Sequence, residues 1–396
     1  MTSLELLRKL VAIASVNPHC LARHPELTGE KRIVDFLERL AQDRGIRAIR
    51  VESEPERPTL LLELPAKNHT PDAPLLACFA HTDTVWVPEL PSPFELREAQ
   101  DGTLHALGVT DDKGSIAAAL LALFALQERG GAPCRFMTVF TCDEEAGFAG
   151  IDSVLPECIR PDAAIVMEGT RLDVVTAHKG TVRWRITSRG VSVHSSLVPQ
   201  GENAIYKSAA LVLALERFSR ELIARACHRR LSHPTLNVGT IRGGTQPNSV
   251  PDRCEIVIDR RLLPGETVEQ AERELRNALS GCGDYELSEP TFFTAPFELD
   301  ETHPFAVLML EKARIGNPAA CFRGLSCSTE AGSTAACGIP TVVFGPGDVA
   351  TAHSVDEALP PGEIDRAAQI ITEAALSFPA STASWNSKQK EGSHAE

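Results

Sequence analysis

The stretches LLACFAHTD (75–83) and FMTVFTCDEE (136–145) decide the fold of this chain. Each is a short, nearly continuous apolar run that ends in histidine or carboxylate side chains. Such runs are typical of strands buried on both faces of a sheet, because a half-buried strand would alternate apolar and polar residues. Similar runs lie at 60–64, 163–167 and 341–345. Together they predict one sheet covered on both faces.

Helical segments separate several of these runs. Residues 2–14 and 29–44 carry apolar side chains at helical spacing, and 113–128 reads as a nearly all-apolar helix that stops before a pair of glycines. A final helix is expected at about 363–377. Alternating strands and helices predict an α/β layer with a mostly parallel sheet.

The segment 178–294 has a different pattern. Apolar and polar residues alternate at 182–187 and 254–259, as in half-buried antiparallel strands, and helices are expected at roughly 202–226 and 266–279. This pattern predicts a smaller α+β domain inserted into the larger one.

The domain boundaries follow from these patterns. We expect a larger domain made of residues 1–177 and 295–378, interrupted by an inserted domain at 178–294. The polar, aperiodic stretch 379–396 is predicted to be a disordered tail. A length of 396 residues agrees with more than one domain.

Composition excludes several classes of protein. A formal net charge of −14 disfavours nucleic acid and anionic membranes as partners. The eleven cysteines are odd in number and include no C-x-x-C pair, which indicates free thiols in a reducing compartment. Neither a signal peptide nor an apolar run of about 18 residues is apparent. We therefore expect a cytoplasmic protein.

The ends of the apolar runs carry the chemistry. In open α/β sheets, ligands bind at the carboxyl ends of the strands, so side chains that follow different strands converge there. The side chains in question are His81 and Asp83, the triplet Asp143, Glu144 and Glu145, then Glu168, His353, and the pair Asp111 and Asp112 that precedes the helix at 113.

Two histidines with three or four carboxylates form a ligand set suited to Zn²⁺, Mn²⁺ or Co²⁺. One carboxylate can bridge two ions about 3.5–4 Å apart. Each motif alone has a plainer interpretation: a lone His-x-Asp is often structural, an acidic pair is often solvated, and Asp111-Asp112 fits a helix cap. The joint placement at strand ends favours a metal centre.

At these residues the chain resembles the M20 family of metallopeptidases and deacylases. The shared motifs are HTDTV (81–85), GVTDDKG (108–114), DEE (143–145), MEGT (167–170) and AHSVDE (352–357). The resemblance is strongest to the acetylornithine deacetylase and succinyl-diaminopimelate desuccinylase branch, through AHKG (177–180), HSS (194–196), PTLNVG (234–239), IDRRLLPG (258–265), STEA (328–331) and GPG (345–347).

The resemblance implies two divalent ions, zinc in the first place and cobalt or manganese otherwise. Asp111 would bridge the ions through its carboxylate, and the peptide bond that follows it is cis in such proteins. His81 and Glu168 would complete one metal site. Glu145 and His353 would complete the other.

The resemblance also assigns roles in catalysis. Glu144 would be the general base, and Asp83 would orient the imidazole of His81. Such relatives carry Glu-Pro-Thr where this chain has Glu-Gly-Thr at 168–170. Glycine at position 169 is expected to loosen the loop that proline would stiffen, which leaves the substrate open.

The inserted domain resembles the family's lid and dimerisation domain. His194 would reach into the active site of the partner subunit of a homodimer and stabilise the oxyanion. Arg260 would bind a substrate carboxylate, and Asn248 would contact substrate. The plainer alternatives are an exposed strand-end histidine and a surface ion pair.

The sequence therefore predicts a two-metal hydrolase that cleaves the amide bond of an N-acyl amino acid. Within the same scaffold, a succinyl-diaminopimelate desuccinylase, a dipeptidase or an aminoacylase remains open. A catalytically silent binding protein would be expected to have lost a ligand or the base. A metal-free glycosidase carboxylate pair leaves His81 and His353 without a role.

Overall fold

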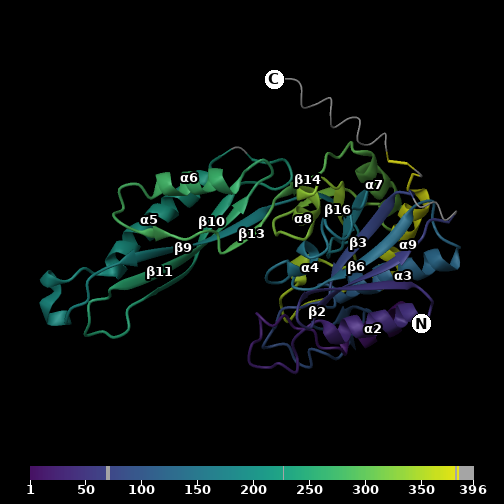
Figure 1. The fold of residues 1–396 in the computed structure, drawn as a ribbon, viewed down its shortest axis with the longest axis horizontal. Coiled ribbons are helices and arrows are strands. Elements are labelled where there is room, and N and C mark those ends of the chain that lie inside the picture. Colours follow the sequence, from purple (N-terminus) through teal and green to yellow (C-terminus); the bar gives the residue numbers. More distant parts are fainter. Residues whose placement is uncertain (68–71, 226, 380, 383–396) are drawn as a thin grey trace, which may run out of the picture. The chain divides into compact units, whose positions relative to one another are not determined.

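The computed structural model describes residues 1–67, 72–225, 227–379 and 381–382, and Figure 1 traces them. The chain divides into two compact units. Unit 1 comprises Met1–Thr176, Leu299–Arg323 and Thr329–Glu396, and unit 2 comprises Ala177–Glu298 and Gly324–Ser328. The assignment of 324–328 to unit 2 was not expected from the sequence. The predicted tail at 379–396 lies almost wholly outside the described residues.

Unit 1 is built on a mixed sheet. The strands, in order across it, are β1 (Arg47–Glu54), β2 (Arg57–Leu64), β6 (Arg135–Thr141), β3 (Leu75–His81), β7 (Ala163–Val166), β16 (Thr341–Val343) and β8 (Val174–His178). The four strands from β6 to β16 pair in parallel, whereas β1, β2 and β8 are antiparallel to their neighbours. The expected parallel sheet is confirmed at its centre, and antiparallel strands extend it on both sides.

Short strands supplement this sheet. Both β14 (Phe297–Glu298), which belongs to unit 2, and β15 (Phe322–Leu325) pair with β8, whose last two residues also belong to unit 2. In unit 1, β4 (Arg97–Glu98) forms a hairpin with β5 (Leu104–His105). Every residue of β2 and β3 is buried, which explains the apolar runs at 60–62 in β2 and 75–80 in β3.

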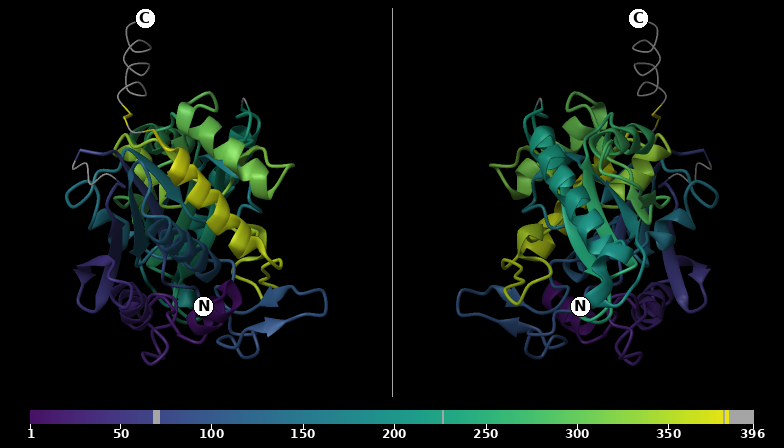
Figure 2. Two further views of the ribbon diagram at one scale, coloured as in Figure 1. Left: turned by 90° about the vertical axis from the view of Figure 1, so that its right-hand side faces the viewer. Right: turned by 90° about the vertical axis from the view of Figure 1, so that its left-hand side faces the viewer.

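Helices cover the sheet of unit 1. The apolar helix α3 (Lys113–Glu128) packs against β3, β6 and α9 (Glu363–Ser377), and Figure 2 shows α9 lying across the strands. The other helices of unit 1 are α1 (Ser3–Val11), α2 (Lys31–Gln42), α4 (Ala149–Asp152), α7 (Pro304–Gly316), α8 (Ala331–Ala336) and the 3₁₀ turn η2 (Val349–Thr351). Among the helices described, none has both the length and the apolar character that crossing a membrane requires.

Unit 2 is an antiparallel sheet with two helices that contact each other and cover one face of the sheet. Its strands run in the order β10 (Thr235–Gly243), β11 (Arg253–Leu262), β9 (Gly180–Arg189) and β12 (Glu286–Leu287), with β13 (Phe292–Thr294) also on β9. The helices are α5 (Ala204–Ile223) and α6 (Val268–Ala278), and a 3₁₀ turn, η1, spans Ser195–Gln200. Figure 2 shows α5 in front of these strands.

The core of unit 2 follows the alternation in its sequence. Trp184 of β9, with Ile256 and Ile258 of β11, packs under Leu215 and Phe218 of α5. The intervening side chains of both strands are more exposed. One sheet face is therefore apolar and covered by helices, and the other is polar.

Candidate metal centre

The strand ends of unit 1 bring the predicted metal ligands together. His81 is the last residue of β3, Glu144 and Glu145 follow β6, and Glu168 follows β7. Asp111 lies at the start of α3, and its peptide bond to Asp112 is cis, as the resemblance implied.

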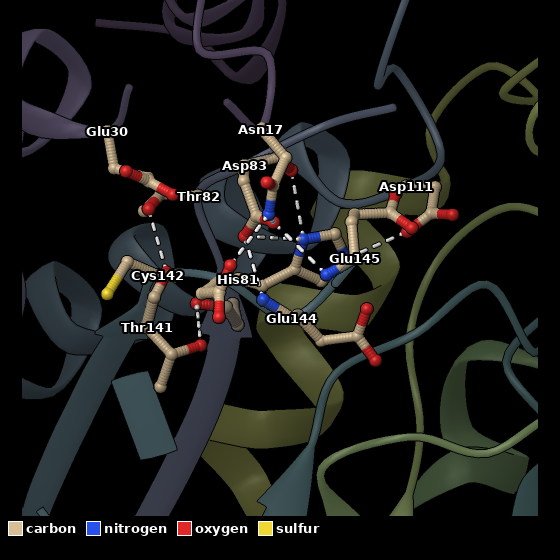
Figure 3. A network of polar contacts seen from close by, with 12 residues as sticks. Asn17, Glu30, His81, Thr82, Asp83, Asp111, Thr141, Cys142, Glu144 and Glu145 are labelled. Atoms are coloured by element: carbon tan, nitrogen blue, oxygen red, sulfur yellow. Dashed lines mark hydrogen bonds and ion pairs between the residues drawn. The ribbon is translucent and has the colours of Figure 1, made fainter. Parts of the chain in front are cut away.

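Asp111 lies between two imidazoles. Its Oδ1 is 2.8 Å from His81 Nε2, and its Oδ2 is 3.0 Å from His353 Nε2. The same His353 nitrogen is 3.1 Å from Glu145 Oε1. Figure 3 shows Asp111, Glu145 and His81 gathered at one point. One carboxylate with a histidine on each oxygen is the arrangement that a bridging ligand needs.

Two overlapping groups of donors could each hold an ion. Donor atoms of His81, Asp111 and Glu145 lie within 4.8 Å of one another, and so do those of His81, Glu144 and Glu168. The side chain of His81 is 2% exposed and that of Asp111 is 9% exposed. The second group includes Glu144, for which the sequence predicted a different role, as base.

The electrostatics of these side chains favour a bound cation. Burial, with the charge of Asp111, raises the pKa of Glu168 well above its ordinary value, and burial with the charge of Glu145 does the same for Glu144. Hydrogen bonds to Asp111 and Glu145 raise the pKa of His353 to about 11. A divalent cation would favour ionised carboxylates and neutral imidazoles, so the donor set fits such an ion.

Asp83 contacts both the histidine and the loop that carries Glu144. The Nδ1 of His81 is 2.9 Å from the main-chain oxygen of Asp83 and 3.6 Å from its carboxylate. The carboxylate accepts the backbone N–H groups of Glu144 and Glu145, each at 3.1 Å. Asp83 therefore fixes the imidazole chiefly through its carbonyl, and its carboxylate holds the loop.

Glu357 is a buried residue beside the site whose role was not predicted from the sequence. Its buried carboxylate accepts the backbone N–H groups of Gly108 and Thr110 at 2.9 Å and of Asp111 at 3.1 Å. It thereby ties the loop after His353 to the loop that carries Asp111. The motif AHSVDE contains this residue, but acidic residues in loops are usually solvated, so the sequence alone gave no signal.

Gly169 occupies a position without space for a side chain. A Cβ there would lie 2.7 Å from the backbone nitrogen of Val349 and 2.7 Å from Thr110 Cγ2. Val349 also donates its N–H to the carbonyl of Gly169 at 2.8 Å. Glycine at this position permits a close approach of two loops, and the expectation that it loosens the loop relative to proline stays a prediction.

The remaining predicted residues belong to unit 2. His194 is exposed, and its Nδ1 is 2.8 Å from Ser196 Oγ. Asn248 is exposed too, and its backbone carbonyl accepts the backbone N–H of Ser195 at 3.0 Å. His194 and Asn248 therefore lie in adjacent segments on the surface of unit 2.

Arg260 lies on the covered face of the unit 2 sheet. Its side chain is 1% exposed and pairs with Glu266 at 2.9 Å. The next residue, Arg261, is 29% exposed and pairs with Asp259 at 2.8 Å, and both line a hollow on the open face. The alternation along β11 indicates that Arg260 is buried, because it lies two residues after the buried Ile258 and therefore on the same face of the strand.

Comparison with known proteins fits this geometry. The profile of peptidase family M20/M25/M40 matches residues 77–377. The chain belongs to this family. It is 31% identical over 319 residues to the acetylornithine deacetylase of Myxococcus xanthus, a match that covers 76% of this chain and 80% of the relative.

Solved structures of M20 proteins share the fold. A tripeptidase from Staphylococcus aureus superposes with a TM-score of 0.76 at 20% identity, covering 94% of this chain and 97% of that one. A dinuclear metal-binding peptidase of the M20 family from Bacillus subtilis superposes with a TM-score of 0.68 at 16% identity, covering 94% and 96%. Membership of the M20 family makes the chain a metal-dependent hydrolase.

Proposed function

We propose that this chain is a two-metal hydrolase that cleaves the amide bond of an N-acyl amino acid. The observation that carries the proposal is the carboxylate of Asp111, with His81 on one oxygen and His353 on the other. We assign His81 and Glu168 to one ion, Glu145 and His353 to the other, and Asp111 to both. Zinc is the expected metal, with cobalt or manganese as substitutes.

When bound, ions in such a site polarise a carbonyl and lower the pKa of water toward neutrality. The work of this chain is to move the proton. Glu144 takes a proton from the attacking water, whose oxygen bonds to the amide carbon. As the carbon–nitrogen bond breaks, Glu144 gives that proton to the leaving nitrogen, and a carboxylate and a free amino acid result.

Residues of unit 2 are proposed to recognise the substrate. His194 would donate a hydrogen bond to the developing oxyanion, and Asn248 would contact the acyl amino acid. For the substrate carboxylate we propose Arg261 in place of Arg260, because Arg261 lies on the open face of the sheet. Access of these residues to substrate would require lid closure.

A homodimer through unit 2 follows from the assignment of His194 and is supported by the surface of this unit. Strand β10 is an edge strand with open backbone groups. Ile241 of β10 is 49% exposed, and Tyr206 and Leu213 of α5 are 72% and 58% exposed. Exposed apolar side chains beside an open strand edge favour a second copy as the partner.

The substrate class rests on the relatives. An acetylornithine deacetylase at 31% identity favours an N-acetyl amino acid over other amides. We assign the protein to the cytoplasm because its eleven cysteines are odd in number and include no C-x-x-C pair, a pattern typical of thiols in a reducing compartment.

The test is amine release from a panel of N-acetyl amino acids, N-succinyl amino acids and dipeptides, before chelation, after chelation and after zinc is added back. We expect activity to vanish with the chelator and to return with zinc, with N-acetyl amino acids cleaved fastest. A preference for succinyl substrates or dipeptides would reassign the protein within the family. Activity indifferent to exhaustive chelation would refute the metal mechanism.

A further inference from the structure

We propose that Arg57 and Asn17, which lie outside the metal site, are positioning residues for the loop that carries Glu144 and Glu145. The proposal deepens the function proposed above, because it assumes that this loop supplies the base and a metal ligand. It rests on a buried chain of polar contacts that begins at Glu30 and ends at the backbone of the loop.

The first link is an ion pair beneath the loop. Arg57, at the start of β2, donates from Nε to Glu30 Oε2 at 3.1 Å, and its two terminal nitrogens reach Glu30 Oε1 and Asp143 Oδ1 at 2.5 and 2.8 Å. The side chains of Arg57, Glu30 and Asp143 are 7%, 0% and 5% exposed. Arg57 thus holds two almost completely buried carboxylates, and its single positive charge balances one of their two negative charges.

The second link is the side-chain amide of Asn17. Its Nδ2 donates to Asp143 Oδ1 at 3.0 Å and to Asp83 Oδ2 at 2.8 Å, so its two protons join two carboxylates. Figure 3 shows Asn17 beside Asp83, with Glu144 and Glu145 close by. Asp83 in turn accepts the N–H groups of Glu144 and Glu145.

Asp143 joins the chain of contacts to the loop itself. Its backbone is left-handed, at a φ of 66°, and its carbonyl accepts the N–H groups of Gly147 and Phe148 at 3.0 and 2.7 Å. A Cβ on Gly147 would lie 2.4 Å from Asp143 Oδ2, so the loop wraps closely around this carboxylate. The orientation of Asp143 therefore fixes the path of the two glutamates that follow it.

An ion pair with a purely structural role would stabilise the fold without affecting the metal site. Experiments on variants can distinguish this structural role from the positioning role. Asn17→Leu keeps the branching and the number of heavy atoms of the side chain but removes both donated hydrogen bonds, and Arg57→Met removes the counter-charge. Removing the outer-shell partners of a metal site costs roughly 10–100-fold in metal affinity or activity. We expect that loss in kcat, with a KM change of less than about threefold.

The control is Arg50→Met, which breaks an ion pair on β1 in the same unit. Arg50 contacts Asp35 at 2.7 Å and Glu38 at 2.5 Å, and neither carboxylate belongs to the site. We expect this variant to lose thermal stability while its kcat and metal affinity stay at the wild-type values. If Arg57→Met or Asn17→Leu does not fold, the milder substitution Asn17→Ser is tested in its place.

Metal affinity, measured by competition with a chelator, and the visible spectrum of the cobalt-loaded protein are read alongside kcat. We expect weaker binding of one ion and a changed cobalt spectrum in the Asn17 and Arg57 variants. Folded Asn17 variants with wild-type kcat, affinity and spectrum would overturn the proposal. Because affinity and spectrum need no substrate, they test the positioning role even if the assigned reaction is wrong.

Discussion

The two units present their functional side chains in opposite ways. In unit 1, His81 and Asp111 are almost completely buried, each with polar partners that fix its orientation, and His353 is the exception at 52% exposed. In unit 2, His194 and Asn248 are exposed on surface segments. Under the proposed assignment, the core of unit 1 would preorganise the proton chemistry, whereas substrate recognition would depend on exposed segments of unit 2.

Glu144→Ala is the strongest test of unit 1. Loss of a general base slows turnover by roughly 10²–10⁴-fold, and a base that is not a ligand can be removed without loss of metal. We therefore expect kcat to fall by that factor while metal content, measured by elemental analysis, stays unchanged. Because Glu144 shares a donor group with His81 and Glu168, loss of one equivalent of metal would instead make it a ligand.

His194→Ala tests unit 2 next. Removing a donor to an oxyanion lowers kcat by about 10²–10³-fold. If His194 acts in the partner's active site, mixing His194→Ala with Glu144→Ala subunits should restore activity, because each mixed dimer contains one intact site. Random exchange predicts about a quarter of wild-type activity. No recovery, with subunit exchange shown by light scattering or labelling, would mean that His194 acts within its own subunit or not at all.

The two units also differ in what their sequences reveal. Continuous apolar runs predicted the buried strands around β3, and α3 begins and ends at the expected residues. The convergence of His81 with Glu144 and Glu168 followed from their placement after strands. Asn17 and Arg57 gave no signal, because contacts at a sequence separation of 86 residues, such as Arg57 to Asp143, depend on the assembled fold.

The sequence of unit 2 holds information that the family motif does not use. Alternation at 254–259 places the even-numbered residues of β11 under the helices, so the pattern by itself excludes Arg260 from the open face. The motif IDRRLLPG contains both arginines and does not distinguish them. By contrast, the exposure of His194 was one of two alternatives that the sequence left open, because this residue lies between elements where no periodicity applies.

The adjacent arginines give the smallest predicted effect and the sharpest contrast within unit 2. A charge-assisted hydrogen bond is worth about 1.5–3 kcal/mol, so Arg261→Ala should raise KM by roughly 10–100-fold with little change in kcat. Arg260→Met should leave KM unchanged and lower the midpoint of thermal unfolding, because it breaks the pair with Glu266. Initial rates over a range of substrate concentrations, with melting curves for both variants, separate the two roles. A KM increase in Arg260→Met alone would return the substrate carboxylate to Arg260 and require that its side chain leave Glu266 when substrate binds.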